Sequence, residues 1–300
     1  MYEKILVALD GSRFSEAILP YARLFADKLK VAVELLHVID ADLATPTSAA
    51  GQARYQEVMA AENERGLVYL KKIADSFSSG RRVHCSVQPG NPAEVIIDKA
   101  AEHRQTLIAM TTHGRSGIDR WLIGSVADKV LHGAANPLLL VRAGETAGVD
   151  GTALWQRIIV PLDGSALAET VIPHATELAR PLGLEIALMR VFGVPTPVFA
   201  EDYGFYVEEL WNQLQDDAEK YLAEKKQQLM AQGLTKVATI VTSGFPAEKI
   251  IDAAREREDA LVAMSTHGRS GVNRWVLGSV TERVVRHGGD PVLIVRAAHE

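Results

Sequence analysis

The chain carries the stretch Thr-Thr-His-Gly-Arg-Ser-Gly-Ile-Asp-Arg-Trp-Leu-Ile-Gly-Ser-Val at residues 111–126 and repeats it, slightly altered, as Ser-Thr-His-Gly-Arg-Ser-Gly-Val-Asn-Arg-Trp-Val-Leu-Gly-Ser-Val at residues 265–280. Each copy follows a short apolar run typical of a strand, and each ends in Gly-Ser before a helix-like segment. A glycine-rich connection from a strand to a helix presents free backbone N–H groups and the positive end of a helix dipole, which suit a phosphate. The stretch therefore predicts a duplicated nucleotide-binding domain.

Three further segments recur along the chain. Residues 5–12, 90–98 and 136–143 return as residues 158–165, 244–252 and 290–297, with an offset of 153 residues for the first pair and 154 for the other two. Two copies are too few for a solenoid, so each half is predicted to be a domain of its own. We expect the first domain at residues 1–143, a linker at 144–154 and the second domain at 155–300.

Within the first half, apolar runs alternate with helical patterns. Strands are expected at residues 4–10, 31–39, 83–87, 107–110 and 138–142, and helices at 13–29, 55–78, from Pro92 onward and at 126–132. Ser12 is the expected N-cap of the first helix. Apolar strands that are continuous rather than alternating indicate a parallel sheet covered on both faces. The predicted fold class is α/β, with two Rossmann-like domains that each hold a five-stranded parallel sheet.

Composition restricts the class of protein. The chain is 47% apolar and 23% charged, which is typical of a soluble globular protein. A formal net charge of −6 and a pI near 5.9 argue against nucleic acid and against an anionic membrane surface as partners. The single cysteine, Cys85, cannot form an internal disulfide, so a reducing cytoplasm is the expected location. The N-terminal residues have no signal-peptide layout, and no apolar run approaches the ~20 residues that span a bilayer.

In a doubly wound sheet, ligands bind beyond the carboxyl ends of the strands, where the winding reverses. Asp10, which follows the first strand, and the loop at residues 111–125 are expected to meet there. Gly114 and Gly124 would let the backbone approach a phosphate closely. Ser125 could cap the following helix and offer its hydroxyl to an anion.

Each of these features also has an interpretation that needs no ligand. Gly-Ser followed by Asp128, or by Glu282 in the second copy, is what a capping box requires. An aspartate before Gly-Ser, such as Asp10 or Asp163, is typical of a turn residue that binds the backbone after it. Both interpretations stay open on the residues alone.

The charged and aromatic residues of the repeated stretch do not form a catalytic pattern. Arg115 and Arg269 could reach a phosphate or lie in solvent. His113 and His267 have no second ligand at metal spacing, so no metal site is predicted. There is no Gly-x-x-x-x-Gly-Lys-Ser/Thr loop and no repeated Ser/His/Asp set. Binding is therefore favoured over catalysis, with at most slow, incidental hydrolysis.

These motifs resemble the universal stress protein family in its tandem two-domain form, over nearly the whole chain. The ATP-binding branch of that family is marked by Gly-x-x-Gly, nine residues, then Gly-Ser or Gly-Thr. Here Gly114, nine residues, Gly124 and Ser125 match, and the second half matches with Gly268, Gly278 and Ser279. Thr111 and Ser265 stand at the first glycine position.

The resemblance implies a set of nucleotide-binding residues and a fold of the adenine-nucleotide α-hydrolase type. Asp10 and Asp163 look like the aspartates near base and sugar, and Val38 and Val191 like the valine whose backbone meets adenine, although ordinary strand packing would also explain both valines. The implied residues are, in the first half, Ala8, Asp10, Val38, Thr111, Gly114, Arg115, Gly124, Ser125 and Val126, and in the second half, Pro161, Asp163, Val191, Ser265, Gly268, Arg269, Gly278, Ser279 and Val280.

The resemblance also implies a function. The chain would bind ATP in one or both halves, with Mg²⁺ held through the phosphates, and act in stress response or signalling. The alternatives are a protein of the same fold with empty pockets that serves as a structural or interaction module, and an enzyme of a related nucleotide-binding class. The resemblance implies that the fifth strands, residues 138–142 and 292–296, pair within one chain. Whether two chains also form a homodimer is not decided by the sequence. The loops at 40–54 and 193–207 show no repeat and have no assigned role.

Overall fold

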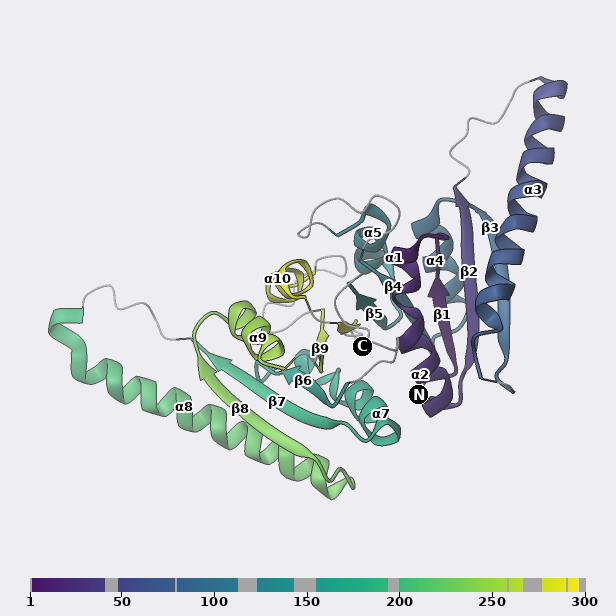
Figure 1. Ribbon diagram of the computed structural model, residues 1–300. Helices are drawn as coiled ribbons and strands as arrows, with labels where there is room; N and C mark the ends of the chain where they lie inside the picture. Colours follow the sequence, from purple (N-terminus) through teal and green to yellow (C-terminus); the bar gives the residue numbers. More distant parts are fainter. Residues whose placement is uncertain are drawn as a thin grey trace. The chain divides into compact units, whose positions relative to one another are not determined.

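The computed structural model describes residues 2–40, 48–78, 80–112, 123–142, 155–193, 200–257, 259–266, 277–289 and 291–296, with the side chains of residue 49 and of residues 200–207 left out (Figure 1). Contacts within the chain divide it into two compact units, Met1–Leu154 and Trp155–Glu300. The expected linker at 144–154 lies outside the described residues.

The first unit is a parallel sheet with helices packed along it. Its strands are β1 (Lys4–Ala8), β2 (Ala32–Asp40), β3 (Val83–Gly90), β4 (Thr106–Thr111) and β5 (Leu138–Val141), in the order β3-β2-β1-β4-β5. Its helices are α1 (Arg13–Glu16), α2 (Leu19–Leu29), α3 (Ala49–Ala74), α4 (Pro92–Ala101) and α5 (Ser125–Gly133). All residues of β4 and β5 are buried, which requires cover on both faces of the sheet because neighbouring side chains point to opposite faces.

The second unit repeats this plan. Its strands are β6 (Arg157–Pro161), β7 (Glu185–Phe192), β8 (Val237–Ser243), β9 (Ala260–Ser265) and β10 (Val292–Val295), in the order β8-β7-β6-β9-β10. Its helices are α6 (Ala166–Glu169), α7 (Ile172–Leu182), α8 (Ala200–Ala231), α9 (Pro246–Arg255) and α10 (Ser279–His287). The four strand pairs are parallel. The predicted α/β fold with a parallel sheet in each half is confirmed.

The expected first helix is interrupted. Residues 13–29 form two helices, α1 and α2, rather than one, because Pro20 has no backbone N–H to donate to the carbonyl of Glu16, as a continuous helix would require. The cap prediction is confirmed, since the Ser12 hydroxyl accepts a hydrogen bond from the N–H of Ser15 at 3.2 Å.

The long helices begin earlier than the sequence pattern indicates. The helix expected at 55–78 spans Ala49–Ala74, and the Ser48 side chain caps it by accepting from the N–H of Gly51 at 3.2 Å. In the second unit α8 begins at Ala200. The regions 40–54 and 193–207, expected as loops, are therefore helical in part.

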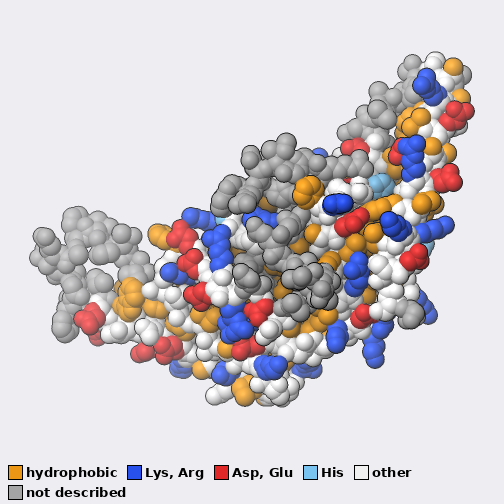
Figure 2. All heavy atoms as spheres, viewed as in Figure 1, with side chains coloured by type: hydrophobic (Ala, Val, Ile, Leu, Met, Phe, Trp, Pro, Cys, Tyr) orange, Lys and Arg blue, Asp and Glu red, His pale blue; other side chains and the backbone are white. Residues whose placement is uncertain are grey.

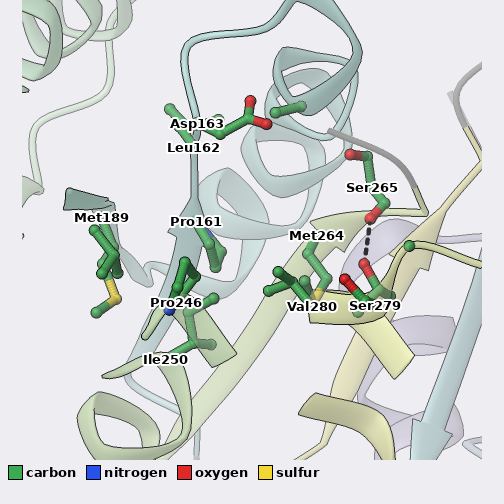
Figure 3. A pocket seen from close by; sticks show the side chains of 14 residues that line it. Pro161, Leu162, Asp163, Met189, Pro246, Ile250, Met264, Ser265, Ser279 and Val280 are labelled. Carbon is green, nitrogen blue, oxygen red and sulfur yellow. Dashed lines mark hydrogen bonds between the residues drawn. The ribbon is translucent and has the colours of Figure 1, made fainter. Parts of the chain in front are cut away.

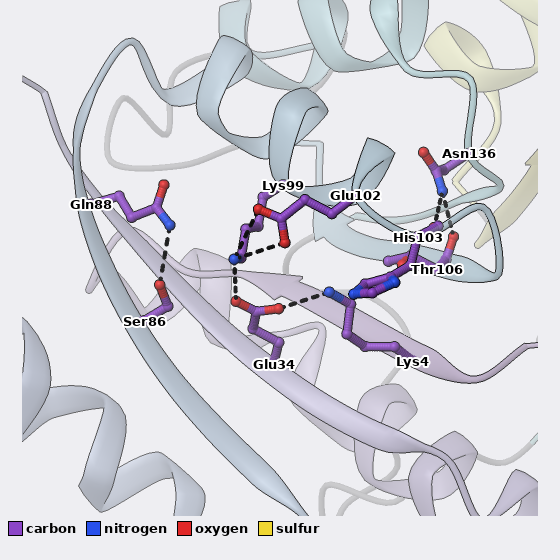
Figure 4. Close-up of polar contacts among 9 residues, drawn as sticks. All are labelled: Lys4, Glu34, Ser86, Gln88, Lys99, Glu102, His103, Thr106 and Asn136. Atoms are coloured by element: carbon purple, nitrogen blue, oxygen red, sulfur yellow. Dashed lines mark hydrogen bonds and ion pairs between the residues drawn. The ribbon is translucent and has the colours of Figure 1, made fainter.

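A cluster of charged side chains lies where β1 and β2 begin, beside α4 (Figure 4). Glu34 is 5% exposed, and its carboxylate accepts a hydrogen bond from Lys4 Nζ at 2.9 Å. Lys99 Nζ lies 3.6 Å from the other oxygen of Glu34 and contacts Glu102 at 2.9 Å. Hydrogen bonding to Glu102, supported by the charge of Glu34, raises the pKa of Lys99 above its ordinary value. Two lysines thus compensate one buried carboxylate.

Charge is mixed on the outer surface. Figure 2 shows acidic and basic side chains intermingled on the face in view, in keeping with 32 Lys and Arg against 38 Asp and Glu. In the described part of the chain, no helix has both the length and the apolar content needed to cross a membrane.

The buried ion cluster generates a stability prediction. Lys4→Met leaves Glu34 without its shortest ion pair, and because a buried charge that loses its partner is strongly destabilising, we expect the free energy of unfolding to fall by about 3 kcal/mol. Urea unfolding measures it. The control is Arg65→Ala, which breaks the exposed pair with Glu62 and should cost less than about 0.5 kcal/mol. Equal losses in the two variants would contradict the compensating role of Lys4.

Candidate functional site

The carboxyl ends of three neighbouring strands form one edge of the second unit. β6 pairs with β7 on one side and with β9 on the other, all in parallel. The chain leaves this edge toward α9 after β8 and toward α10 after β9. Parallel strands with helical crossovers therefore bring strand ends and helix beginnings to the same place, where ligands bind in doubly wound sheets.

A cavity of about 250 Å³ lies at this edge (Figure 3). Among the residues implied by the sequence it is lined by Pro161, Asp163, Val191, Ser265, Gly278, Ser279 and Val280. Its other lining residues are Leu162, Ala168, Met189, Pro246, Ile250, Met264 and Thr281. The sequence thus identified the polar lining except for Thr281 and missed most of the apolar lining.

The cavity has two chemically different ends. In Figure 3, Met189, Pro246 and Ile250 lie together at one end, and Ser279 and Ser265 lie at the other, beyond Met264. The first end is apolar and comes from β7 and α9. The second carries hydroxyl groups and the beginning of α10. A ligand with one flat apolar part and one anionic part would match this arrangement.

The beginning of α10 is fixed to the end of β9. The N–H of Gly278 donates to the carbonyl of Thr266 at 2.8 Å, and the Thr281 hydroxyl donates to the carbonyl of Ser265 at 2.9 Å. The first unit has the same backbone hydrogen bond, from Gly124 to Thr112 at 2.7 Å. The strand end and the helix beginning are therefore held together, although the residues between them, 113–122 and 267–276, lie outside the described ones.

The capping-box interpretation is wrong. Gly124 and Gly278 are the N-cap residues, and Ser125 and Ser279 stand one position inside the helix. Glycine has no side chain with which to cap, and among the described residues no other side chain does so. The N–H groups at the two helix beginnings thus remain available to an anion, and the helix dipole favours one.

The turn interpretation of Asp10 and Asp163 is confirmed. Oδ1 of Asp163 accepts hydrogen bonds from the N–H of Ser165 at 2.9 Å and from its hydroxyl at 2.6 Å. Oδ1 of Asp10 accepts from the N–H of Ser12 at 2.9 Å. Gly164 has a φ of +86°, a conformation that glycine adopts without strain. Because the turn is fixed, Asp163 lines the cavity from a defined position.

A tyrosine of the long helix holds the short helix after this turn. The Tyr221 hydroxyl donates to Glu169 at 2.7 Å, and the Arg190 guanidinium lies 4.7 Å from the centre of the Tyr221 ring. The first unit has the same hydrogen bond, from Tyr69 to Glu16 at 3.1 Å. Burial, together with the neighbouring glutamate, raises the pKa of both tyrosines well above the ordinary range.

The predicted residues of the first unit occupy equivalent places. Ala8 ends β1, Val38 lies in β2 and Thr111 ends β4, and these strands are neighbours in the sheet. Gly124, Ser125 and Val126 open α5. The four loop residues Gly114, Arg115, Gly268 and Arg269 lie outside the described residues.

The missed lining residues carry signals that the sequence does contain. Met189 lies two residues before Val191, so both side chains belong to the same face of β7. Pro246 and Ile250 are four residues apart and share one face of α9. These lining residues could have been identified from their position on the faces of β7 and α9, although not from their residue type. Among the described residues, no group of three or more His, Cys, Asp or Glu is arranged to hold a metal ion.

Comparison with known proteins gives consistent matches. The sequence model of the universal stress protein family matches residues 1–142 and 154–296. A universal stress protein of Mycolicibacterium smegmatis is 25% identical over an alignment of 300 positions that covers 97% of this chain and 96% of that protein. One from Methanocaldococcus jannaschii is 29% identical over 147 residues, 49% of this chain and 85% of that protein. The crystal structure of a universal stress protein from Archaeoglobus fulgidus superposes with a TM-score of 0.73 and 23% identity, covering 98% of each chain, which shows a shared fold.

The two half-buried tyrosines predict a dependence on alkaline pH. A raised pKa means that the unfolded chain releases the tyrosine proton first, so the free energy of unfolding should fall as the pH rises above about 10. Tyr221→Phe should cost about 1 kcal/mol near neutral pH through the lost hydrogen bond and should make the alkaline fall shallower. Urea unfolding across this pH range measures both effects, and Tyr69→Phe is the matched variant in the other half. An equally steep fall in both variants and wild type would contradict the assignment.

Proposed function

The chain belongs to the universal stress protein family in both of its halves, and from this premise we propose that each half binds one molecule of ATP and that the protein acts in stress response or signalling. One observation carries the proposal: the cavity of the second unit joins an apolar end to a helix beginning whose N–H groups are not capped by any described side chain. The two ends suit the two parts of an adenine nucleotide.

The apolar end fits the base. Met189, Ile250 and Pro246 offer flat or flexible apolar surface, and the backbone of Val191 lies at the same end of β7. Asp163, held by its turn, is proposed to lie near base and sugar. Adenine sites are typically apolar with few polar groups that set orientation, and this lining has that character.

The helix beginning fits the phosphates. Gly278 adds no side chain to the cavity lining, and the N–H groups of Ser279 and Val280 together with the Ser279 hydroxyl can donate to phosphate oxygens. We propose that the loop residues Gly268 and Arg269 complete this end. Mg²⁺ enters the proposal only through the phosphates, which is how it commonly binds to nucleotides.

The same roles are proposed in the first half. Ala8, Asp10 and Val38 would face base and sugar, and Thr111, Gly114 and Arg115 would complete the loop. Gly124, Ser125 and Val126 would bind phosphate as the start of α5. The hydrogen bonds that the two halves share at the aspartate turn and at the helix beginning support this assignment.

We propose that the protein binds ATP without catalysing its turnover. Asp163 is the single carboxylate among the described residues that line the cavity, and its Oδ1 is engaged by Ser165. Bound nucleotide would raise the stability of the folded state in proportion to the logarithm of its occupancy and so alter the lifetime or the partners of the protein. Steady release of ADP or AMP would favour an enzyme of a related class instead.

The arrangement of the two halves is also a proposal. We propose domains at 1–143 and 155–300 with a linker at 144–154, and pairing of β5 with β10 inside one chain. Both strands are short and fully apolar, and each stands at one end of its own five-strand order. An uncovered apolar edge strand would favour aggregation, so pairing would remove a liability. A homodimer of two chains and a cytoplasmic location belong to the same proposal.

A negative charge added at the helix beginning tests the ATP proposal. Ser279→Asp places a carboxylate in the first turn of α10, where the dipole stabilises it by about 0.3–1 kcal/mol, so the unfolding temperature should hold or rise. The same carboxylate repels a triphosphate, so ATP affinity in that half should fall at least about tenfold. Isothermal titration calorimetry on the full chain measures the ATP affinity. In Ser279→Asp, the number of ATP molecules bound per chain should drop from two to one.

Ser279→Asn, which has the same size without the charge, is the control and should retain most of the affinity. Ser125→Asp should remove the other molecule of ATP. Wild-type affinity in both aspartate variants would contradict the phosphate role of the two helix beginnings. No heat and no thermal shift in wild type at millimolar ATP and Mg²⁺ would favour the alternative of a structural module with empty pockets.

A further inference from the structure

Phe245 stands at an unusual place for a large apolar residue. It is the N-cap of α9 and is 71% exposed, the largest exposed fraction among the large apolar side chains with described surroundings. Pro246, the next residue, lines the cavity, and Ile250 in the following turn does so too. Phe245 therefore stands beside the apolar end of the cavity.

The equivalent residue of the first half behaves differently. Asn91 is the N-cap of α4, and its side-chain oxygen accepts from the N–H of Ala93 at 3.1 Å and of Glu94 at 3.4 Å. Asparagine is among the best N-cap residues, whereas phenylalanine has no side-chain atom that can accept a hydrogen bond. The second half thus gives up a cap, which disfavours the folded state, and leaves an aromatic ring exposed that gains little from burial.

Two aromatic residues are linked to the segment that precedes Phe245. The N–H of Gly244 donates to the carbonyl of Phe192 at 3.1 Å, which joins the segment before Phe245 to the end of β7. The Phe192 ring meets Trp211 of α8 edge to face, with centroids 5.5 Å apart at 81°. The first half has Ile39 at the position of Phe192, by the offset of 153, and Met59 at that of Trp211, by the offset of 152 that separates Tyr69 from Tyr221. The aromatic set belongs to the second half alone.

The backbone at Phe245 is extended and its side chain is exposed. A residue before proline is held in extended conformation, and Phe245 has φ −82° and ψ 119°. The position of the ring depends on its two side-chain torsions alone, so reorienting it requires no movement of α9. Aromatic rings bind nucleobases by stacking on their faces.

We propose that Phe245 stacks on the base of the nucleotide in the second half and makes that half the tighter of the two sites. The inference rests on the proposed ATP binding and adds to it a base-recognition residue that the first half lacks. Phosphate binding through α10 is independent of this ring, because Ser279 lies at the opposite end of the cavity (Figure 3). The ring therefore affects the adenosine part of the ligand only.

The test replaces Phe245 by the residue of the other half. Phe245→Asn is made in a Ser125→Asp background, so that calorimetry reports the second half, with ATP and inorganic tripolyphosphate as separate ligands. We expect ATP affinity to fall about fivefold or more and tripolyphosphate affinity to stay unchanged. Without ligand, the unfolding temperature should rise by roughly 2–4 °C, because the helix regains a side-chain cap. Phe245→Tyr, which keeps a stacking ring, should bind ATP as the background does.

The outcomes separate the two proposals. If the background protein binds no ATP, the proposed function fails, and with it the inference. If the background binds ATP and Phe245→Asn binds it equally well, only the inference is overturned. A loss of tripolyphosphate affinity, or a fall in the unfolding temperature, would also overturn it, because either would mean that Phe245 supports the fold. Asn91→Ala is the control and should lower the unfolding temperature without changing ATP affinity in the second half.

Discussion

Parallel pairing of a central strand with its two neighbours is the constraint on which the rest of each unit depends. Because β6 lies between β7 and β9 in parallel register, the residues that end these strands meet at one edge. Parallel strands also require crossovers, and helical crossovers begin at that same edge. The cavity, the aspartate turn and the start of α10 are consequences of this arrangement rather than separate features.

Within that frame, the chain caps its helices selectively. Ser12, Ser48, Asn91 and Ser165 each accept a hydrogen bond from the first turn of their helix. By contrast, α5 and α10 have glycine as their N-cap residue, and a backbone hydrogen bond joins each N-cap to the strand before it. The position of these two helix beginnings is therefore fixed without using the N–H groups that a cap would occupy. Uncapped but immobile donors are what an anion site needs.

The sequence was sufficient for the fold and for the polar part of the candidate site, because duplicated motifs and continuous apolar runs are local signals. The sequence did not suffice where the role of a residue depends on contacts with residues distant in the chain. The residues alone could not decide the ligand-free interpretation of the aspartates or that of the Gly-Ser pairs. Hydrogen bonds of Asp10 and Asp163 confirm the turn, whereas the position of Ser279 one residue inside α10 contradicts the capping box. Met189 and Ile250 were missed because an apolar residue on a strand or helix is equally suited to core and cavity. The break before α2 was readable from Pro20, whereas the start of α3 at Ala49 was not, since its first turns bury little.

The duplication provides an internal comparison that a single domain would not. The two halves share the aspartate turn, the tyrosine–glutamate hydrogen bond and the glycine N-cap that joins strand to helix. They differ at the base end, where Ala8, Ile39 and Asn91 in one half correspond to Pro161, Phe192 and Phe245 in the other. Features required by the fold or by a phosphate should be alike in both halves, since both halves fold in the same way. A difference confined to the apolar end is better explained by what that end contacts. The two sites should therefore differ in how they hold the base and not in how they hold the charge.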